Sequence, residues 1–139
     1  IRNEASCVLR VESAHGAALL MGDVGGIVER EIMRRDPGSI PADVVVTGHH
    51  GSRTSSDPTF VNATGAGHAL MSAGYGNRFG HPHEQVEYRW SRAGAQVLST
   101  ASGGALRIRL VDGGPRAEQR RLAQPRLWDA QRRLAEPPP

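Results

Sequence analysis

The architecture of this protein follows from residues 42–56, which read Ala42-Asp-Val-Val-Val-Thr-Gly-His-His-Gly-Ser-Arg-Thr-Ser-Ser56. The first six residues are so apolar that they predict a strand with neither face fully solvated. That strand runs directly into a loop of Gly, His and Ser. An α/β scaffold usually places its reactive groups in loops at strand ends, where backbone is exposed without disrupting the sheet. The stretch therefore predicts a central strand and a candidate site together.

Strands and helices alternate on both sides of this stretch. Residues 6–12 and 17–21 predict a hairpin, because alternating apolar residues are followed by a turn and a short apolar return. Helices are predicted over 25–35, 57–64 and 84–93. Further strands are predicted over 69–73, 95–100 and 105–110, the last two pairing around Ser102-Gly103-Gly104. This order predicts an α/β layered fold.

Charge is unevenly distributed along the 139 residues, a length that suits one domain. Residues 1–114 carry 11 Arg and 11 acidic residues, and the remainder carries six Arg and three acidic residues. The body is therefore no basic nucleic-acid platform. A single cysteine, Cys7, excludes an internal disulfide and a cysteine-based zinc site. No apolar run reaches the roughly 20 residues of a membrane span, and no signal peptide is recognisable.

The candidate site consists of two histidine clusters, each in a glycine-containing loop that follows a predicted strand: His49-His50 and His81-x-His83. Adjacent side chains diverge, so one histidine of a pair can bind a metal while the other faces a substrate or a carboxylate. Singly, such histidines are more often structural than functional.

The polar residues near these clusters can be interpreted as structural or as functional. Asp23 is either the N-cap of the helix beginning near Gly25 or a carboxylate metal ligand at a strand end. Asp57 reads as a helix cap only. Ser52 supplies a hydroxyl, while Arg53 and Arg78 are either surface residues or neutralise a phosphate.

Several of these motifs occur in an order typical of a known family: Leu-Met-Gly22-Asp23, Gly-His49-His50-Gly51-Ser52-Arg-Thr-Ser-Ser and Gly-Asn77-Arg78-Phe-Gly80-His81-Pro82-His83. Together they resemble the C-terminal metallo-β-lactamase-like domain of ComEC-type competence proteins, which form the DNA-internalisation channel of bacterial transformation. The resemblance runs from about Asn3 to Leu110. The second and third motifs carry most of its specificity.

The resemblance implies an α/β fold that is the C-terminal half of a metallo-β-lactamase-like αββα sandwich, spanning residues 1–112. Residues 113–139 are then an Arg/Pro-rich tail, either a short helix or disordered. The implied activity is that of a metal-dependent nuclease with two divalent metals, Zn or Mn, which degrades the non-transported DNA strand. Asp23 and His49 match metal ligands, with His50 the less favoured alternative ligand and a third catalytic candidate. Substrate-binding roles near the scissile phosphate fall on Ser52, Arg78, His81 and His83.

One departure from the family pattern limits these expectations. The His-x-(His/Asp)-x-Asp-His metal cluster of the superfamily occurs nowhere in the sequence, and only Asn3 stands near the place of an upstream histidine ligand. Two protein ligands are too few for a tight Zn or Mn site. We therefore expect an isolated half-domain that is inactive alone. The alternative is a DNA-binding or structural half-domain without catalysis.

The expected partners follow from the same resemblance. They are single-stranded DNA, the missing N-terminal half of the domain, and the membrane channel of the same protein. The exposed sheet face of a half-sandwich also predicts self-association as a paired or swapped dimer. The parent protein is expected in the bacterial cytoplasmic membrane with this domain on the periplasmic side, the fragment itself being soluble.

Overall fold

A computed structural model describes residues 3–129. Its main element is a five-stranded mixed sheet in the order β1-β2-β3-β4-β5. An antiparallel hairpin of β1 (Leu9–Ser13) and β2 (Gly16–Leu20) forms one edge. The remaining strands run parallel to β2: β3 (Val44–Val46), β4 (His68–Met71) and β5 (Gln96–Ser99). The expected α/β class and the first hairpin are confirmed.

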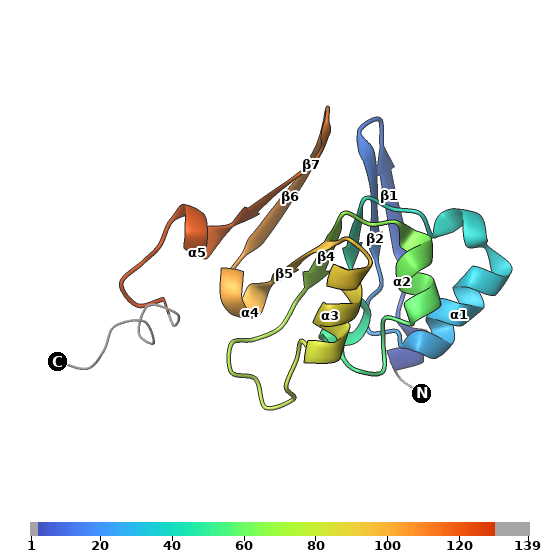
Figure 1. Cartoon of the computed structure of the whole chain (residues 1–139), viewed down its shortest axis with the longest axis horizontal. Helices are drawn as coiled ribbons and strands as arrows, with labels where there is room; N and C mark the ends of the chain where they lie inside the picture. The colour runs from blue at the N-terminus through green and yellow to red at the C-terminus, as the bar shows by residue number, and fades with distance from the viewer. Residues whose placement is uncertain (1–2, 130–139) are drawn as a thin grey trace.

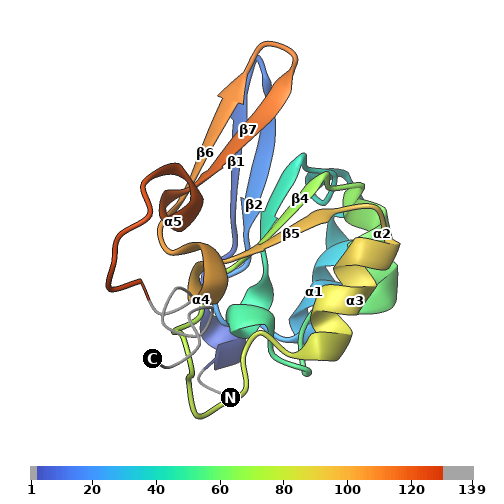
Figure 2. The ribbon, with the colours of Figure 1, turned by 60° about the vertical axis from the view of Figure 1, so that its left-hand side comes forward.

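Three helices cover one face of this sheet (Figures 1 and 2). They are α1 (Gly26–Arg35), α2 (Pro58–Thr64) and α3 (Glu84–Arg92), each at or near its expected bounds. Phe60 and Trp90 of these helices pack with Met21, Val45 and Met71 of the strands in one buried core. Single turns of 3-10 helix occur at Asn3–Ala5 (η1) and Pro37–Ser39 (η2), whereas Gly48–Gly51 (η3) is a turn whose two histidines do not have helical backbone.

The N-terminal ends of α1 and α2 show which of the two aspartates, Asp23 and Asp57, caps a helix. The Asp57 side chain accepts a hydrogen bond from Thr59 N (2.9 Å), so Asp57 caps α2 as expected. The N-cap of α1 is Gly25, and no side chain caps that helix. Asp23 is therefore no helix cap, and its side chain is left for another role.

The C-terminal strands pair differently from the expectation. β5 is the edge of the large sheet and is followed by a short helix, α4 (Thr100–Gly103). β6 (Leu106–Val111) pairs with β7 (Gly114–Gln119) in a separate antiparallel hairpin. The predicted pairing of 95–100 with 105–110 is wrong, because the Ser99 side chain accepts from Ala101 N (3.1 Å) and begins a helical turn there.

The β6–β7 hairpin lies on the sheet face opposite the helices, and β6 contacts β2 (Figure 2). The boundary expected after residue 112 falls in the turn of this hairpin. After β7, α5 (Arg120–Ala123) docks on α4 through hydrogen bonds from Arg121 Nη1 to the carbonyls of Ala101 (2.7 Å) and Ser102 (3.0 Å). Leu127 lies in a turn, and the rest of the helix considered for the tail lies outside the described residues.

The sheet face away from the helices keeps apolar side chains in solvent. Leu9 is 56% exposed, Val11 45% and Leu20 37%. Leu9 is the register partner of Leu20, and Val11 is the partner of Ala18, so these side chains share one face. Between residues 3 and 129, no helix is long and apolar enough to cross a membrane.

Candidate functional site

Three loops meet at the carboxyl ends of the parallel strands β2, β3 and β4. His49 N donates to the Gly22 carbonyl (2.9 Å), which joins the loop after β3 to the loop after β2. His83 N donates to the Gly51 carbonyl (2.9 Å), which joins the same loop to the one after β4. Parallel strands place their carboxyl ends on one edge, where α/β proteins bind their ligands. Both histidine clusters and Asp23 therefore belong to one region.

The loop after β3 has an unusual backbone. His49 has φ 48° and His50 has φ 57°, both in the left-handed region that residues other than glycine rarely adopt. Each such residue costs on the order of 1–3 kcal/mol and persists only where surrounding contacts hold it. Gly48 permits the close approach to the β2 loop, because a Cβ at this position would lie 2.4 Å from the Val24 carbonyl oxygen.

His50 faces Asp23. His50 Nδ1 lies 2.8 Å from the Ser72 carbonyl oxygen, which only accepts, so Nδ1 carries the hydrogen. His50 Nε2 lies 3.3 Å from Asp23 Oδ1. Metal-binding histidines donate one ring N–H to a carbonyl or carboxylate and direct the other nitrogen at the metal, and the bond from His50 Nδ1 to the Ser72 carbonyl is of the first kind.

His49 has different partners. Asn3 Nδ2 lies 3.2 Å from His49 Nε2, and Thr54 Oγ1 lies 3.5 Å from His49 Nδ1. The amide group donates, so His49 Nε2 is an acceptor. The sequence favoured His49 as the histidine that acts with Asp23, whereas the structure brings His50 beside Asp23 and Asn3 beside His49.

His81 completes the cluster. Its ring makes an edge contact with the His49 ring at 5.9 Å and stacks on the Phe79 ring at 6.0 Å. Burial lowers the pKa of His81, and the neighbouring His49 and His50 lower it further. His81 is therefore neutral at pH 7. In the described part of the chain its Nδ1 atom is buried without a hydrogen-bond partner.

A buried carboxylate supports the His49-His50 loop from beneath. Glu29 of α1 is fully buried and accepts hydrogen bonds from Ser56 N (2.8 Å) and Asp57 N (2.6 Å). Burial raises the pKa of Glu29, while these two backbone donors oppose the shift. Trp90 Nε1 donates to Ser56 Oγ (3.0 Å), and Arg89 donates to the Ser56 carbonyl. The end of the loop is thereby held by α1 and α3.

Three other expected site residues have identifiable contacts. Ser52 is buried, and its Oγ lies 3.2 Å from Thr54 Oγ1, so it orients the hydroxyl beside His49. His83 caps α3, its Nδ1 accepting from Gln85 N (3.2 Å). The Arg78 guanidinium lies 4.9 Å from the centre of the Phe79 ring.

The described residues supply part of a metal site. Asp23 and His50 have the donor types that Zn and Mn accept, and the fixed His50 tautomer fits a metal ligand. Between residues 3 and 129, no group of three or more His, Cys, Asp or Glu side chains is placed to hold an ion. The pair therefore fits a metal whose other ligands come from elsewhere.

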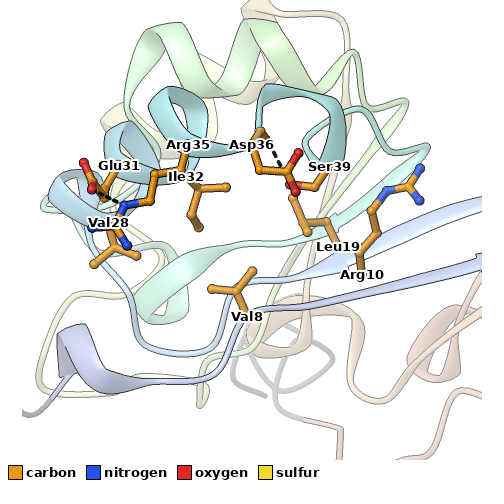
Figure 3. A pocket seen from close by; sticks show the side chains of 9 residues that line it. All are labelled: Val8, Arg10, Leu19, Val28, Glu31, Ile32, Arg35, Asp36 and Ser39. Atoms are coloured by element: carbon orange, nitrogen blue, oxygen red, sulfur yellow. Dashed lines mark hydrogen bonds and ion pairs between the residues drawn. The ribbon is translucent and has the colours of Figure 1, made fainter.

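An apolar hollow lies apart from this cluster. It has a volume of about 380 Å³ and lies between α1 and the β1–β2 hairpin (Figure 3). Val8, Leu19 and Ile32 line it, and two of its four charged residues, Glu31 and Arg35, pair with each other. Its lining includes neither Asp23 nor a histidine, so it adds nothing to the chemistry described above.

Comparison with known proteins finds relatives over most of the chain. Competence protein ComA of Neisseria gonorrhoeae is 39% identical over 120 residues, 86% of this chain. ComE operon protein 3 of Bacillus subtilis is 36% identical over 108 residues, 78% of this chain. Recombination protein 2 of Haemophilus influenzae is 35% identical over 106 residues, 76% of this chain. The chain is homologous to ComEC-type competence proteins.

The ComEC-type relatives are far longer than this chain. The matched segments make up 17%, 14% and 13% of the three proteins in the order given. No protein-family model and no solved structure matches the chain. The family expected from the sequence motifs is confirmed by the relatives.

Several residues of this site were not expected from the sequence. Glu29 reads as one more charge on an amphipathic helix, although its carboxylate is buried under the histidine loop. The Ser72 carbonyl is a backbone group and has no sequence signal. Asn77 is signalled only by its place within the family motif.

Proposed function

We propose that this chain is part of a metal-dependent nuclease in a DNA-uptake protein, and that it acts on the strand that is not transported. The observation that carries the proposal is the pairing of Asp23 with His50, whose other nitrogen is fixed by the Ser72 carbonyl. The relatives named for competence support the biological setting. The helix-covered sheet with an apolar second face suits one half of a metallo-β-lactamase-like αββα sandwich.

In this proposal Asp23 and His50 are protein ligands of a divalent metal, Zn or Mn. The chemistry that such a metal supplies when bound is activation of water and neutralisation of phosphate charge. His49, held by Asn3, lies within 6.4 Å of His50 between ring centres and is placed to contact the same substrate. Arg53 and Arg78 are exposed on the two histidine loops, where a guanidinium can bind a phosphate.

The remaining ligands come, in the same proposal, from another part of the longer protein. That part also covers the apolar face formed by Leu9, Val11 and Leu20. The parent protein then holds this domain on the periplasmic side of the cytoplasmic membrane, with single-stranded DNA as substrate. The chain alone binds metal weakly and does not cut DNA.

The test is a chimera of the gonococcal relative in which this chain replaces the matched 120 residues. We expect the chimera to cleave a labelled single-stranded oligonucleotide with Mn²⁺, and this chain alone not to. Asp23→Ala and His50→Ala abolish cleavage by the chimera. Asp112→Ala, an exposed aspartate at the β6–β7 turn, is the matched control and leaves cleavage intact.

Two outcomes overturn the proposal. In the first, neither the unmodified relative nor the chimera cleaves the oligonucleotide with Mn²⁺ or with Zn²⁺. The other is a chimera whose cleavage is unchanged by Asp23→Ala.

A further inference from the structure

A large aromatic side chain stands exposed beside the histidine cluster. Phe79, in the loop between β4 and α3, is 68% exposed. One exposed apolar residue is common on protein surfaces. Phe79 differs in its neighbours, because the Arg78 guanidinium lies over its ring at 4.9 Å and the His81 ring stacks on it with an interplanar angle of 24°. The loop thus presents a cation and stacked rings together.

Asn77 holds this loop in one conformation. Its Oδ1 accepts from Phe79 N (3.2 Å) and from His81 N (3.0 Å). Its Nδ2 donates to the carbonyls of Gly74 (2.8 Å) and His81. Four hydrogen bonds from one side chain fix the backbone on both sides of the Phe79 ring. A ligand that stacks there meets a loop already ordered, which lowers the entropy cost of binding.

A shallow hollow connects Phe79 to the site. It has a volume of about 250 Å³, and its lining includes Phe79, Asn77 and His81 together with His50 and Ser72. This volume is below the roughly 300–1,000 Å³ of pockets that enclose a drug-sized ligand. It suits a single planar group rather than a whole small molecule. Through His50, such a group lies next to Asp23.

The two histidine loops carry two cations, and the Asp23 carboxylate of the neighbouring loop faces them at His50. Residues 48–56 and 74–83 carry Arg53 and Arg78 and contain neither Asp nor Glu. A ligand with planar apolar groups joined by negative charges matches both the aromatic ring and the cations. Nucleic acids have these two features, and single-stranded nucleic acids bind proteins by stacking bases on aromatic side chains beside basic residues.

We propose that Phe79 is a stacking platform for one nucleobase of a single strand: the base takes the ring face over which the Arg78 guanidinium now lies, and Arg78 pairs with an adjoining phosphate. The inference rests on the proposed function for the substrate class and adds a specificity-determining residue to it. Duplex DNA keeps its bases stacked inside the helix, so it cannot use this platform without extruding a base. The platform therefore selects single strands over duplexes.

The test compares two fluorescein-labelled oligonucleotides of equal length, oligo-dT and a strand in which most bases are replaced by abasic sites. Binding to this chain is measured by fluorescence anisotropy at low salt. We expect Phe79→Ala to weaken oligo-dT binding about 5- to 150-fold, the effect of losing one stacked base. Binding of the abasic strand stays unchanged, because it keeps the phosphates and lacks the bases.

Two further variants separate stacking from general effects. Phe79→Tyr keeps an aromatic ring and retains the affinity for oligo-dT. Tyr88→Ala removes an aromatic residue of α3 with similar exposure, 65%, from a different part of the surface, and leaves both affinities unchanged.

Four outcomes overturn the inference. The first three are no measurable binding of oligo-dT, an equal loss of affinity for both strands in Phe79→Ala, and no loss of affinity for either strand. The fourth is that Phe79→Ala destabilises the chimera but still binds oligo-dT normally, which would assign Phe79 to packing against the rest of the protein. None of these depends on DNA cleavage. The binding test can therefore fail while the chimera still cleaves DNA, and it can succeed while the chimera does not, so failure of this inference and failure of the proposed function are distinguished.

Discussion

Asp23 and His50 lie with Oδ1 and Nε2 3.3 Å apart, although 27 residues separate them in the sequence. Asp23 follows β2 and His50 follows β3, which are parallel neighbours, so the sheet itself sets this distance. The second nitrogen of His50 is held by the Ser72 carbonyl after β4. Three consecutive strands of one sheet therefore define the orientation of a single imidazole.

The first prediction concerns which histidine binds metal. Because His50 faces Asp23 and His49 accepts from Asn3, we expect Asp23→Ala and His50→Ala to lower the Mn²⁺ affinity of this chain by more than about tenfold, the smallest loss typical of changes around metal ligands. The loss is measured from the electron paramagnetic resonance signal of free Mn²⁺. His49→Ala has a smaller effect, and Asp112→Ala has none. The assignment fails if His49→Ala removes binding and His50→Ala does not.

The second prediction concerns the tautomer of His49. Its Nε2 accepts from the Asn3 amide, so the neutral ring carries its hydrogen on Nδ1. The ¹⁵N chemical shifts of the ring at pH 8 report this tautomer directly. Asn3→Ala removes the donor, and we expect the Nδ1–H population of His49 to fall. The tautomer of His50, set by Ser72, is unchanged and serves as the internal control; an unchanged His49 ring would contradict the prediction.

Local signals in the sequence predicted the helices and strands better than they predicted which strands pair. Asp57-Pro58 marks the start of α2 because both residues act within one turn of helix. The partner of β6 is hard to recognise, since β7 contains Pro115 and begins at the second of two consecutive glycines. Proline is tolerated there because β7 has only one strand neighbour in its sheet. A strand of this composition reads as a tail until its partner is known.

In the candidate site, too, local sequence patterns were informative and long-range contacts were not. Glycine-rich loops after apolar strands identified both histidine clusters, because that pattern is local. Which ring faces Asp23 depends on left-handed backbone at both His49 and His50, a conformation that histidine does not signal in a sequence. The burial of Glu29 depends on Ser56 and Asp57, nearly 30 positions along the chain. Long-range contacts of this kind leave no pattern in the sequence.

The third prediction concerns the support of the loop by Glu29. Glu29→Ala leaves the backbone N–H groups of Ser56 and Asp57 without acceptors, and each unsatisfied buried donor costs about 1–3 kcal/mol. We expect the free energy of unfolding, measured in urea, to fall by about 2–4 kcal/mol. Glu31→Gln changes a half-exposed glutamate of the same helix, whose pairs with Arg34 and Arg35 are surface ion pairs, and leaves the unfolding free energy nearly unchanged. A Glu29→Ala variant as stable as the wild type would contradict the assigned role.

The fourth prediction gives the pH dependence of the same residue. The pKa of Glu29 is raised above its usual 4.5, so the folded state holds a proton that the unfolded state has already lost. Stability contributed by Glu29 is therefore full below that value and falls as the pH rises through the folded pKa. Glu29→Gln lacks this dependence, so the unfolding free energy of the wild type falls relative to that of the variant between pH 4 and pH 8. A relative rise would mean that the hydrogen bonds from the Ser56 and Asp57 backbone outweigh burial.

The fifth prediction concerns the apolar sheet face of Leu9, Val11 and Leu20, which lies opposite the helices. Exposed apolar patches of this kind promote association, and a second copy of the chain can cover the face symmetrically. We expect the chain to self-associate with increasing concentration in sedimentation velocity, and Val11→Glu to shift it to the monomer. Ile27→Glu places the same charge at a 69% exposed apolar position on α1, across the sheet, and leaves the association unchanged. A wild-type chain that stays monomeric at all concentrations, or an Ile27→Glu variant that dissociates as Val11→Glu does, would rule out this face as the interface.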